Sequence, residues 1–500
     1  MYKYYYPLIT AEEAASMIEN GQTVAFSGFT AAGAAKAVPL ALAKRGRELQ
    51  AKGKPFQVRV LSGASTGALD ENLAGSNIIS WRAPYQSSRT LRSQINKQQV
   101  KFTDLHLSHL PQMVLFGFFG KIDVAVVEAV EVTSDGRVYL STSIGASPTF
   151  LRCAEKVIIE LNHYHSVRLN EMADIHILPP PPNRSPIPIY TPLDKIGLPY
   201  MAIDPKKIVG VVENNQPDGN TSLDAPTEVH RKIAEQVVNF LLEELKAGRI
   251  PKDFLPLQAG VGNIANAVMA VLGEAPEIPP FYMYTEVLQD SLIDLMQSGK
   301  LLGVSSTSLT ISDEILKRVY ENMDFFAPRI VLRPQELSNN PGVIRRLGVI
   351  SLNTALEVDL TGHANSTHIC GKDIVNGIGG SGDFTRNAYL SIFMCPSVAK
   401  GGRISTVVPM ATHGDNNEHS VQVLVTEQGL ADLRGLDPME RAHRIINNCA
   451  HPAYKDYLLR YWEQAPVGHI RQDLSKCFEL HRNLMEYGQM LPDLDLSQFS

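Results

Sequence analysis

The chain has 500 residues, of which 44% are apolar, and its formal net charge at pH 7 is −6. Because a single hydrophobic core seldom extends beyond about 250–300 residues, this length predicts two domains. The negative charge offers no overall positive field, which excludes nucleic acid as an expected partner and restricts any phosphate-binding surface to a local patch.

Cysteine usage and the N-terminal segment predict a soluble cytoplasmic protein. The five cysteines are odd in number, scattered and without CxxC spacing, which indicates free thiols in a reducing compartment rather than disulfides or a zinc site. The N-terminal segment has aromatic and acidic residues where a signal peptide has a basic start and an apolar run. Because no apolar run approaches the roughly 18–20 residues of a membrane span, we expect no membrane association.

The first half of the chain has the element order of a parallel α/β sheet. Residues 10–18 predict a helix that begins with Thr10 ahead of two glutamates, residues 23–29 predict a buried strand, and residues 30–50 resume helical spacing. Further short apolar runs, separated by helical or loop segments, lie at residues 56–66, 123–132, 156–162 and 207–212. This alternation is typical of parallel strands that are buried on both faces.

The second half repeats this order after a proline-rich segment. Residues 177–193 contain too many prolines for a helix or a strand and predict a surface loop or strap. A long amphipathic helix is then predicted at residues 225–248. It is followed by strands at 254–260, 281–286, 303–311, 329–334, 348–360 and 421–429, with a helix at 264–272. We therefore predict two similar α/β domains, residues 1–224 and 225–500.

Two glycine-rich loops mark candidate ligand sites. Gly260, Gly262 and Ala265 fit GxGxxA, and Gly377, Gly379 and Gly382 fit GxGxxG. The second loop belongs to a run with five glycines between residues 371 and 386, a density that a core helix or strand does not tolerate. This density favours a close approach of the backbone to a ligand.

A dinucleotide site is one interpretation of these loops, but each motif alone is weak support for it. Asp383 directly follows the second loop, whereas ribose recognition would place an acidic residue about 20 residues further on. For the first loop, Glu286 lies 24 residues beyond Gly262, so the spacing leaves a dinucleotide site open.

Glu286 is also a candidate for chemistry of its own. It ends a predicted strand, and α/β sheets gather their ligands at the carboxyl ends of strands. Backbone N–H groups of the glycine loops could stabilise an oxygen that becomes negative during a reaction. A glutamate with the ordinary pKa of about 4.3 is ionised at pH 7 and could attack an activated acyl group without a general base. The alternative is a surface glutamate at the end of a strand.

Two histidine pairs resemble metal ligands but lack the rest of a site. His163 and His165 lie in NHYHS, and His363 and His368 lie in GHANSTH. Neither pair has cysteines or carboxylates at a recognisable ligand spacing, so we expect no catalytic metal.

Two other polar motifs also have simpler explanations. His413 and Asp415 in THGD could form a base and its orienting group, but an ionised glutamate needs no base, so a structural turn is favoured. Ser65 in SGASTG lacks the GxSxG elbow of a nucleophilic serine and is interpreted as a loop hydroxyl.

Longer stretches along nearly the whole chain carry a family resemblance. They read SGFTAAGAAKAVPLALAKR, QAGVGNIANAV, YTEVLQD, ELSNNPGVIRRLG, NTALEVDLTGHANSTH, NGIGGSGDFTRNAYLS, PSVAKGGRIS and VTEQGLADLRG. With them the sequence resembles the acetyl-CoA hydrolase/transferase family of class I CoA-transferases, and most closely the succinyl-CoA:acetate CoA-transferases. Several of these stretches are too long and too specific for a chance match.

The resemblance implies roles for individual residues. Glu286 of YTEVLQD would be the nucleophile that becomes a glutamyl-CoA thioester, Asn339 of SNNP would position the reacting groups, and Glu427 of VTEQG would lie near the site. Main-chain amides near Val261, Gly262 and Gly380 would form an oxyanion hole. The residues implied to contact CoA are Gln258, Ala259, Gly260, Val261, Gly262, Gly379, Gly380 and Lys400.

The resemblance also implies a fold and a reaction. The fold would be two similar open α/β/α domains with the active site in the cleft between them, and the protein would be a homodimer. The enzyme would exchange CoA between a short-chain acyl-CoA and a carboxylic acid by ping-pong chemistry, with no metal and no cofactor beyond CoA as co-substrate. Succinyl-CoA with acetate is the first choice, and propionyl- or butyryl-CoA with acetate or succinate is the alternative.

Other functions remain open at this point. An acetyl-CoA hydrolase would differ only in letting water reach the intermediate, a dinucleotide-dependent oxidoreductase would bind nicotinamide, and an acyl-CoA-binding protein would bind without turnover. One departure from the family concerns succinate: its users carry an arginine near the stretch that reads PDGNTS in this chain, which has Gly219 there.

Overall fold

The computed structural model describes residues 5–221 and 225–499 and divides into two compact units. Unit 1 contains Met1–Ser222, Tyr282–Leu347 and Asn376–Asp383, and unit 2 contains Leu223–Phe281, Gly348–Val375 and Phe384–Ser500. Both units therefore draw on separate stretches of chain. The boundary predicted after residue 224 touches residues 222–224, which lie outside the described residues, and it stays a prediction.

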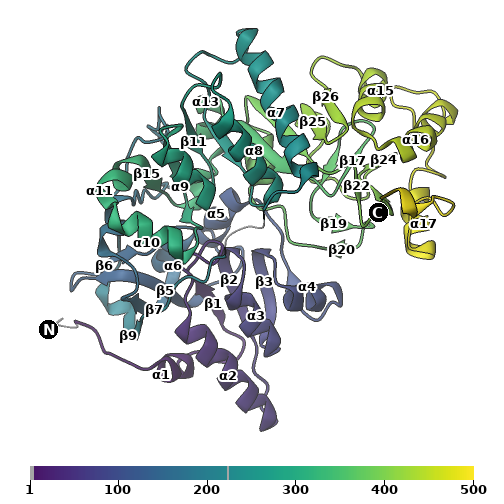
Figure 1. Ribbon diagram of the computed structural model, residues 1–500. Helices are drawn as coiled ribbons and strands as arrows, with labels where there is room; N and C mark the ends of the chain where they lie inside the picture. The colour runs from purple at the N-terminus through teal and green to yellow at the C-terminus, as the bar shows by residue number, and fades with distance from the viewer. Residues whose placement is uncertain (1–4, 222–224, 500) are drawn as a thin grey trace. The chain divides into compact units, whose positions relative to one another are not determined.

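Unit 1 is built on a sheet of nine strands whose central members are parallel (Figure 1). The strands are β1 (Thr23–Phe26), β2 (Val58–Ser65), β3 (Ile79–Gln86), β4 (Lys101–Phe102), β5 (Ile122–Val132), β6 (Arg137–Leu140), β7 (Ala154–Asn162), β8 (Met201–Ala202) and β9 (Ile208–Asn214). β1 lies between β2 and β5, and β5, β7 and β9 follow one another in parallel register. The strands predicted in the first half of the chain are confirmed.

Helices lie before and between the strands of this sheet along the chain, and the first two correspond to those predicted at residues 10–18 and 30–50. They are α1 (Ala11–Ser16), α2 (Ala37–Ala51), α3 (Ala68–Gly75), α4 (Arg89–Asn96), α5 (Leu110–Leu115) and α6 (Ser147–Cys153). Thr10 and Glu13 form a capping box at the start of α1, since Thr10 Oγ1 accepts from Glu13 N at 3.1 Å and Glu13 Oε2 accepts from Thr10 N at 2.7 Å. Phe26, Leu42 and Leu73 belong to the core between sheet and helices.

The second stretch of unit 1 adds a smaller set of elements. They are β12 (Val287–Leu288), α9 (Asp290–Gln297), β13 (Leu301–Ser306), β14 (Ser308–Leu309), α10 (Asp313–Glu321), α11 (Met323–Phe326), β15 (Ile330–Leu332), α12 (Gln335–Ser338) and α13 (Pro341–Leu347). β13 pairs with β15, and β12 with β14, both in parallel. The third stretch contributes most of the short helix α14 (Ser381–Thr385).

Unit 2 has its own parallel strands. β10 (Leu257–Ala259), β16 (Ile350–Thr354), β21 (Leu390–Met394) and β25 (Val423–Thr426) pair in that order, and β26 (Gly429–Asp432) closes the edge in antiparallel register. Figure 1 shows the long helix α7 (Glu228–Lys246) beside α8 (Asn263–Glu274), and these two helices pack against each other. The predicted order of helix, strand, turn and helix in this region is confirmed.

The rest of unit 2 consists of short strands and three terminal helices. The strands are β17 (Glu357–Asp359), β18 (Ala364–Asn365), β19 (His368–Ile369), β20 (Asp373–Ile374), β22 (Val398–Ala399), β23 (Ile404–Ser405) and β24 (Val407–Val408). The helices are α15 (Pro438–Cys449), α16 (Pro452–Gln464) and α17 (Glu479–Tyr487). Tyr454, Leu458 and Trp462 of α16 are buried in the core of this region.

Three predicted strands are interrupted in the structure. Residues 303–311 form β13 and β14, residues 421–429 form β25 and the start of β26, and residues 348–360 form β16 and β17. In the last case β17 leaves the main strands and pairs with β18 and β24 in a separate small sheet. Continuous hydrophobicity predicts burial, but it does not reveal where a chain changes sheets.

Two further expectations concern segments without regular structure and membrane helices. The proline-rich residues 177–193 form neither a helix nor a strand, as predicted. Within the described ranges, none of the helices combines the length and the hydropathy needed to cross a bilayer.

A buried group of charges links the start of α2, strand β5 and the segments that follow β7 and β9 in unit 1. Lys36 Nζ lies 2.5 Å from Glu128 Oε2 and 3.1 Å from Asp218 Oδ1, and His165 Nε2 lies 3.5 and 3.3 Å from the same two carboxylates. Burial alone would lower the pKa of Lys36, but Glu128 and Asp218 outweigh it and raise that pKa above its ordinary value. The ammonium group thus places its single positive charge between two buried carboxylates.

Lys36→Met should destabilise unit 1 by about 3–5 kcal/mol, because it leaves two buried carboxylates without their cation. Differential scanning calorimetry would show a lower unfolding temperature. Lys121→Met is the matched control, since Lys121 forms ion pairs with Asp123 and Glu155 while its side chain stays 65% exposed. Equal unfolding temperatures for the two variants would contradict a stabilising role of the buried group.

Candidate active site

Glu286 lies between β11 (Phe281–Tyr284) and β12, two residues beyond the end of the strand that the sequence predicts to reach residue 286. Its carbonyl oxygen accepts hydrogen bonds from Thr307 N at 2.9 Å and from Ser306 Oγ at 2.7 Å. The next residue, Val287, belongs to a small apolar cluster with Phe29, Ala64, Leu107 and Tyr85. Glu286 therefore starts from a fixed backbone next to an apolar cluster, and the residue itself is half-buried.

Asn339 is the hydrogen-bond partner of this carboxyl group. It is fully buried at the end of α12, and its Nδ2 donates to Glu286 Oε1 at 2.6 Å and to Asp383 Oδ2 at 3.3 Å. Its Oδ1 accepts from Ser338 Oγ at 2.7 Å. Because an ionised carboxylate only accepts hydrogen bonds, the two acidic neighbours and the Ser338 hydroxyl together fix which end of the amide faces Glu286.

Asp383 completes this chain of hydrogen bonds from the other side. Its carboxylate is buried in α14 and accepts from Ser108 Oγ at 2.6 Å and from Ser108 N at 3.1 Å. The sequence pattern suggested only a ribose ligand at Asp383 and not this role, although its place directly after the glycine loop is a usable signal. Nothing in the sequence indicates that Ser108, 275 residues earlier, is its partner.

Gly380 brings the backbone of the second glycine loop against the same carboxyl group. A Cβ atom at this position would lie closer than 3.0 Å to Glu286 Oε1 and Asn339 Nδ2, so no residue with a side chain fits without displacing them. A Cβ on Gly382 would overlap His106 in the same way, and one on Gly377 would lie 2.9 Å from Asp104 Oδ1. Within unit 1 the loop backbone thus lies close to protein side chains, whereas the predicted approach to a ligand stays a prediction.

Burial changes the acidity of both carboxyl groups. It raises the pKa of Glu286 to about 7, with the Asn339 hydrogen bond opposing and the negative charge of Asp383 reinforcing the shift. Burial also raises the pKa of Asp383 to about 6, against the hydrogen bonds from Ser108 and Asn339. The expectation that Glu286 is fully ionised at pH 7 is therefore wrong, because the ordinary pKa on which it relied takes no account of burial. Such a shift is typical of functional carboxyl groups.

The first glycine loop lies in unit 2, between β10 and α8. Gln258 is buried and exchanges hydrogen bonds with Asn353 at 3.4 and 3.3 Å, and Ala259 ends β10. Gly260 N donates a hydrogen bond to Leu352 O in β16 at 3.1 Å, so this amide is not available to a ligand.

The next two residues of this loop lead into α8. Val261 is 53% exposed, and Gly262 precedes the first helical residue with a φ of 142°, a conformation that favours glycine. The loop therefore presents an accessible turn at the start of a helix of 12 residues.

Lys400 lies on a hairpin of unit 2 that Glu427 contacts from another segment. Lys400 is exposed in the turn between β22 and β23, with a φ of 54°. Glu427 follows β25 and accepts hydrogen bonds from Ser397 N at 2.8 Å and from Ser397 Oγ, just ahead of β22. Its carboxylate therefore holds the hairpin that carries Lys400.

The structure thus brings Glu286, Asn339 and Gly380 together in unit 1, with Gly379 next to Gly380 at a φ of 58°. The remaining predicted residues belong to unit 2, where they are Gln258, Ala259, Gly260, Val261, Gly262, Lys400 and Glu427. Gly219, where the succinate users of the family would carry an arginine, is exposed and has a φ of 71°.

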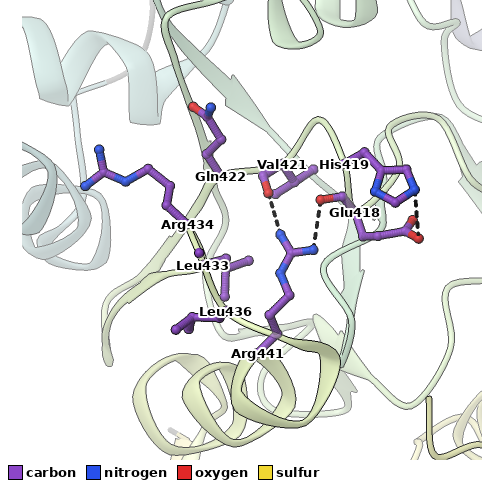
Figure 2. Close-up of a pocket in the computed structure, with 9 residues that line it drawn as sticks. Glu418, His419, Val421, Gln422, Leu433, Arg434, Leu436 and Arg441 are labelled. Atoms are coloured by element: carbon purple, nitrogen blue, oxygen red, sulfur yellow. Dashed lines mark hydrogen bonds and ion pairs between the residues drawn. The ribbon is translucent and has the colours of Figure 1, made fainter. Parts of the chain in front are cut away.

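A separate hollow of about 300 Å³ lies in unit 2 (Figure 2). Arg441 lines it and donates to the backbone oxygens of Glu418 at 2.8 Å and Val421 at 2.7 Å. Arg434 also lines it and is paired with Asp432 and Glu244. Both guanidinium groups therefore hold the protein's own chain, and the hollow contains none of the predicted site residues.

Comparison with known proteins identifies relatives over the whole chain. Residues 1–213 match the family model of the acetyl-CoA hydrolase/transferase N-terminal domain, and residues 316–462 match that of the C-terminal domain. The propanoyl-CoA:succinate CoA transferase of Escherichia coli is 60% identical, with 97% of this chain and 98% of that protein aligned. The succinyl-CoA:acetate CoA-transferase of Clostridium kluyveri is 46% identical, with 97% and 90% aligned.

Solved structures agree with the fold. RipA from Yersinia pestis has a TM-score of 0.69 at 24% identity, and the 4-hydroxybutyrate CoA-transferase of Porphyromonas gingivalis has a TM-score of 0.63 at 23% identity. Each alignment covers 91% of this chain and 96% of the other. The predicted α/β architecture of the CoA-transferase type is therefore confirmed.

The carboxyl group of Glu286 should lose its proton with a midpoint near pH 7. Isotope-edited infrared difference spectra would follow this titration, with Glu286→Gln as the reference that lacks the carboxyl band. Asn339→Ala should move the midpoint to higher pH, because it removes a hydrogen bond that favours the ionised form. Asp383→Asn should move it to lower pH, because it removes a nearby negative charge. Glu155→Gln, a change at an exposed carboxylate, should leave it in place; a wild-type midpoint near pH 4.5 would contradict the effect of burial.

Proposed function

The chain belongs to the acetyl-CoA hydrolase/transferase family, and we propose that it is a CoA-transferase that exchanges CoA between a short-chain acyl-CoA and a carboxylic acid through a glutamyl-CoA thioester at Glu286. The observation that carries this proposal is the half-buried Glu286 carboxyl group, held by Asn339 against the bare backbone of Gly380. A group that is only partly hydrated and has a pKa near 7 is suited to covalent catalysis.

The relatives narrow the choice of acids. Succinate or its CoA ester occurs in the names of both the Escherichia coli and the Clostridium kluyveri enzymes, whereas the second acid is propanoate in one and acetate in the other. We therefore propose succinate as one substrate. Propanoate is favoured as the other because the relative that uses it is 60% identical, and acetate, the first choice from the sequence, is the alternative.

The reaction proceeds through two covalent intermediates. An oxygen of Glu286 attacks the thioester carbonyl, the carbon–sulfur bond breaks, and CoA thiolate leaves behind an acyl-glutamyl anhydride. The thiolate then attacks the glutamyl carbonyl, and the first acid departs with the bridging oxygen. The incoming acid reverses both steps and restores the Glu286 carboxylate. Because one thioester replaces another, the overall reaction requires no metal, redox cofactor or external energy source.

The residues around Glu286 have distinct tasks in these steps. Asn339 holds Oε1, so the other carboxylate oxygen is the one that attacks. When thiolate adds to the glutamyl carbonyl, negative charge develops on its oxygen, and the Asn339 N–H group is already placed to stabilise that charge. The Gly380 amide, together with those of Val261 and Gly262, would stabilise the corresponding charge on the substrate carbonyl.

We further propose that CoA contacts come from the first glycine loop and Lys400, and that Glu427 supports them. The support is geometric: the turn of residues 261–262 is accessible at the start of α8, and Lys400 is exposed on a hairpin that Glu427 holds. Binding energy from the distant nucleotide can then be used at the reacting carbonyl. We also propose that the protein is a homodimer and that it is cytoplasmic. The five free cysteines agree with a reducing compartment.

Hydrolysis is the second candidate, since the family description names hydrolases as well as transferases. It needs the same nucleophile and differs only in whether water reaches the anhydride or the glutamyl thioester. The partial burial of Glu286 favours transfer, because both intermediates last longer where fewer water molecules reach them.

Incubation with succinyl-CoA or propanoyl-CoA should increase the intact mass of the protein by that of CoA less one water, and peptide mapping should place the adduct on Glu286. The isolated adduct should be discharged faster by succinate, propanoate or acetate than by buffer alone. Discharge by buffer at the same rate would identify a hydrolase. Transfer without any adduct at Glu286, or full activity of Glu286→Gln, would exclude the mechanism.

Gly380→Ala should lower kcat by at least about 100-fold, because the added methyl group displaces Glu286 and Asn339 by about 1 Å or more. CoA affinity, measured by calorimetry, should change much less. Gly75→Ala at the end of α3 is the control, since a Cβ atom there meets open space. Normal activity of the Gly380 variant would contradict the close approach.

A further inference from the structure

Two sequence motifs without a catalytic role come together in unit 2. His368 lies in β19, and His413 and Asp415 lie in the loop after β24. Each residue offers one ligand atom, and these three atoms lie within 4.8 Å of one another. The two imidazole rings are 3.9 Å apart, and His413 Nε2 lies 3.1 Å from Asp415 Oδ1. The cluster thus contains two histidines and one carboxylate.

The sequence had suggested a different pairing. His363 and His368 share the motif GHANSTH, but His363 lies between Asp359, at 3.2 Å, and Glu418, at 2.7 Å. The carboxylate that seemed to be missing beside His368 comes from the motif THGD, 47 residues further along the chain. Ligand spacing within one motif could not reveal this arrangement.

Hydrogen bonds hold the carboxylate and one imidazole in place. Asp415 accepts from Ser366 N at 2.6 Å, and Thr367 Oγ1 lies 2.7 Å from Asp415 Oδ1 and 2.7 Å from His368 Nδ1. A hydroxyl group has one proton, and the carboxylate is the better acceptor, so the hydroxyl oxygen receives the Nδ1–H of His368. We assign the proton of neutral His368 to Nδ1, which leaves the Nε2 lone pair for a ligand.

The two segments that carry these residues are fixed to each other. Ala364 N donates to Asn416 O at 2.8 Å, and Asn416 N donates to Ala364 O at 3.1 Å. The cluster is also accessible, since the His413 side chain is 41% exposed. An ion can therefore reach a site whose backbone is already in position.

We propose that His368, His413 and Asp415 bind one divalent transition-metal ion of the zinc type, with water as the fourth ligand. Two imidazole nitrogens and a carboxylate suit Zn²⁺ or Co²⁺ and disfavour Mg²⁺ and Ca²⁺, which prefer oxygen. Metal–ligand bonds of about 2.0–2.2 Å require the three atoms to come closer than 4.8 Å, and rotation of the exposed His413 provides this movement. The ion replaces the proton between His413 and Asp415.

A second group of potential ligands illustrates what the site needs. Glu128, His165 and Asp218 of unit 1 also place their ligand atoms within 4.8 Å of one another. There, however, the Lys36 ammonium group already lies 2.5 and 3.1 Å from the two carboxylates and supplies the cation. No lysine or arginine is paired with Asp415 in the part of the chain that the structure describes. The Asp415 charge is left for a metal.

The proposed ion has a structural role that is separate from the chemistry at Glu286. It would link the start of β19 to the loop that contains residues 413–415, across a sequence separation of about 45 residues. Because metal binds only the folded arrangement, it should stabilise unit 2 in proportion to its affinity.

The test uses the full-length protein without a histidine tag, freed of metal by a chelator and titrated with Zn²⁺ by calorimetry and with Co²⁺ by visible absorption. We expect one equivalent to bind and to raise the unfolding temperature. His413→Ala and Asp415→Asn should lower the affinity at least about 100-fold and abolish the thermal shift. His419→Ala is the matched control, because His419 lies in the same region with its side chain 82% exposed.

Three results would overturn the proposal. They are the absence of stoichiometric binding to the parent protein, equal binding by the His413 and His419 variants, and loss of binding on cysteine alkylation alone. Because His413 is at the surface, its variant should fold normally, and circular dichroism at equal concentration checks this.

Discussion

The hydrogen bond from Asn339 to Glu286 is the interaction on which the site depends. It joins a half-buried carboxyl group to a neutral amide rather than to a cation. Such a group survives burial only if its geometry is exact. The buried Asp383 orients the amide, Ser108 anchors Asp383, and Gly380 leaves room for the pair. Asp383, Ser108 and Gly380 thus all serve to hold the Asn339–Glu286 pair in place.

The surroundings of Glu286 affect two properties of its carboxyl group in opposite directions, namely the fraction that is ionised and the reactivity of the ionised form. A fully hydrated glutamate would be ionised at pH 7 but would be stabilised by water and weak as a nucleophile. A glutamate with a pKa near 7 is ionised in about half of the molecules, and its charge is poorly stabilised before it attacks. The same exclusion of water protects the anhydride and the thioester, so one physical condition serves both the nucleophile and its products.

Sequence patterns predicted the elements well and the connections between them less well. The strand that ends two residues before Glu286, the helix that begins after Gly262 and the tight packing of a glycine loop all follow from local composition. The chain from Ser108 through Asp383 to Asn339 does not, because it joins residues that are 275 and 44 positions apart. The raised pKa of Glu286 was missed for the same reason, since burial depends on distant segments. The pairing of His368 with His413 is a further example.

The segmented make-up of unit 1 has a consequence for synthesis of the protein. Asn376–Asp383, which contains Gly380 and Asp383, belongs to a unit whose first stretch ends at residue 222. A ribosome that adds roughly 5–20 residues per second needs on the order of ten to thirty seconds to translate from one point to the other. During that interval the nascent N-terminal region is without the loop that completes the nucleophile's surroundings. The reactive carboxyl group is therefore assembled only late in translation, after most of the polypeptide has been made.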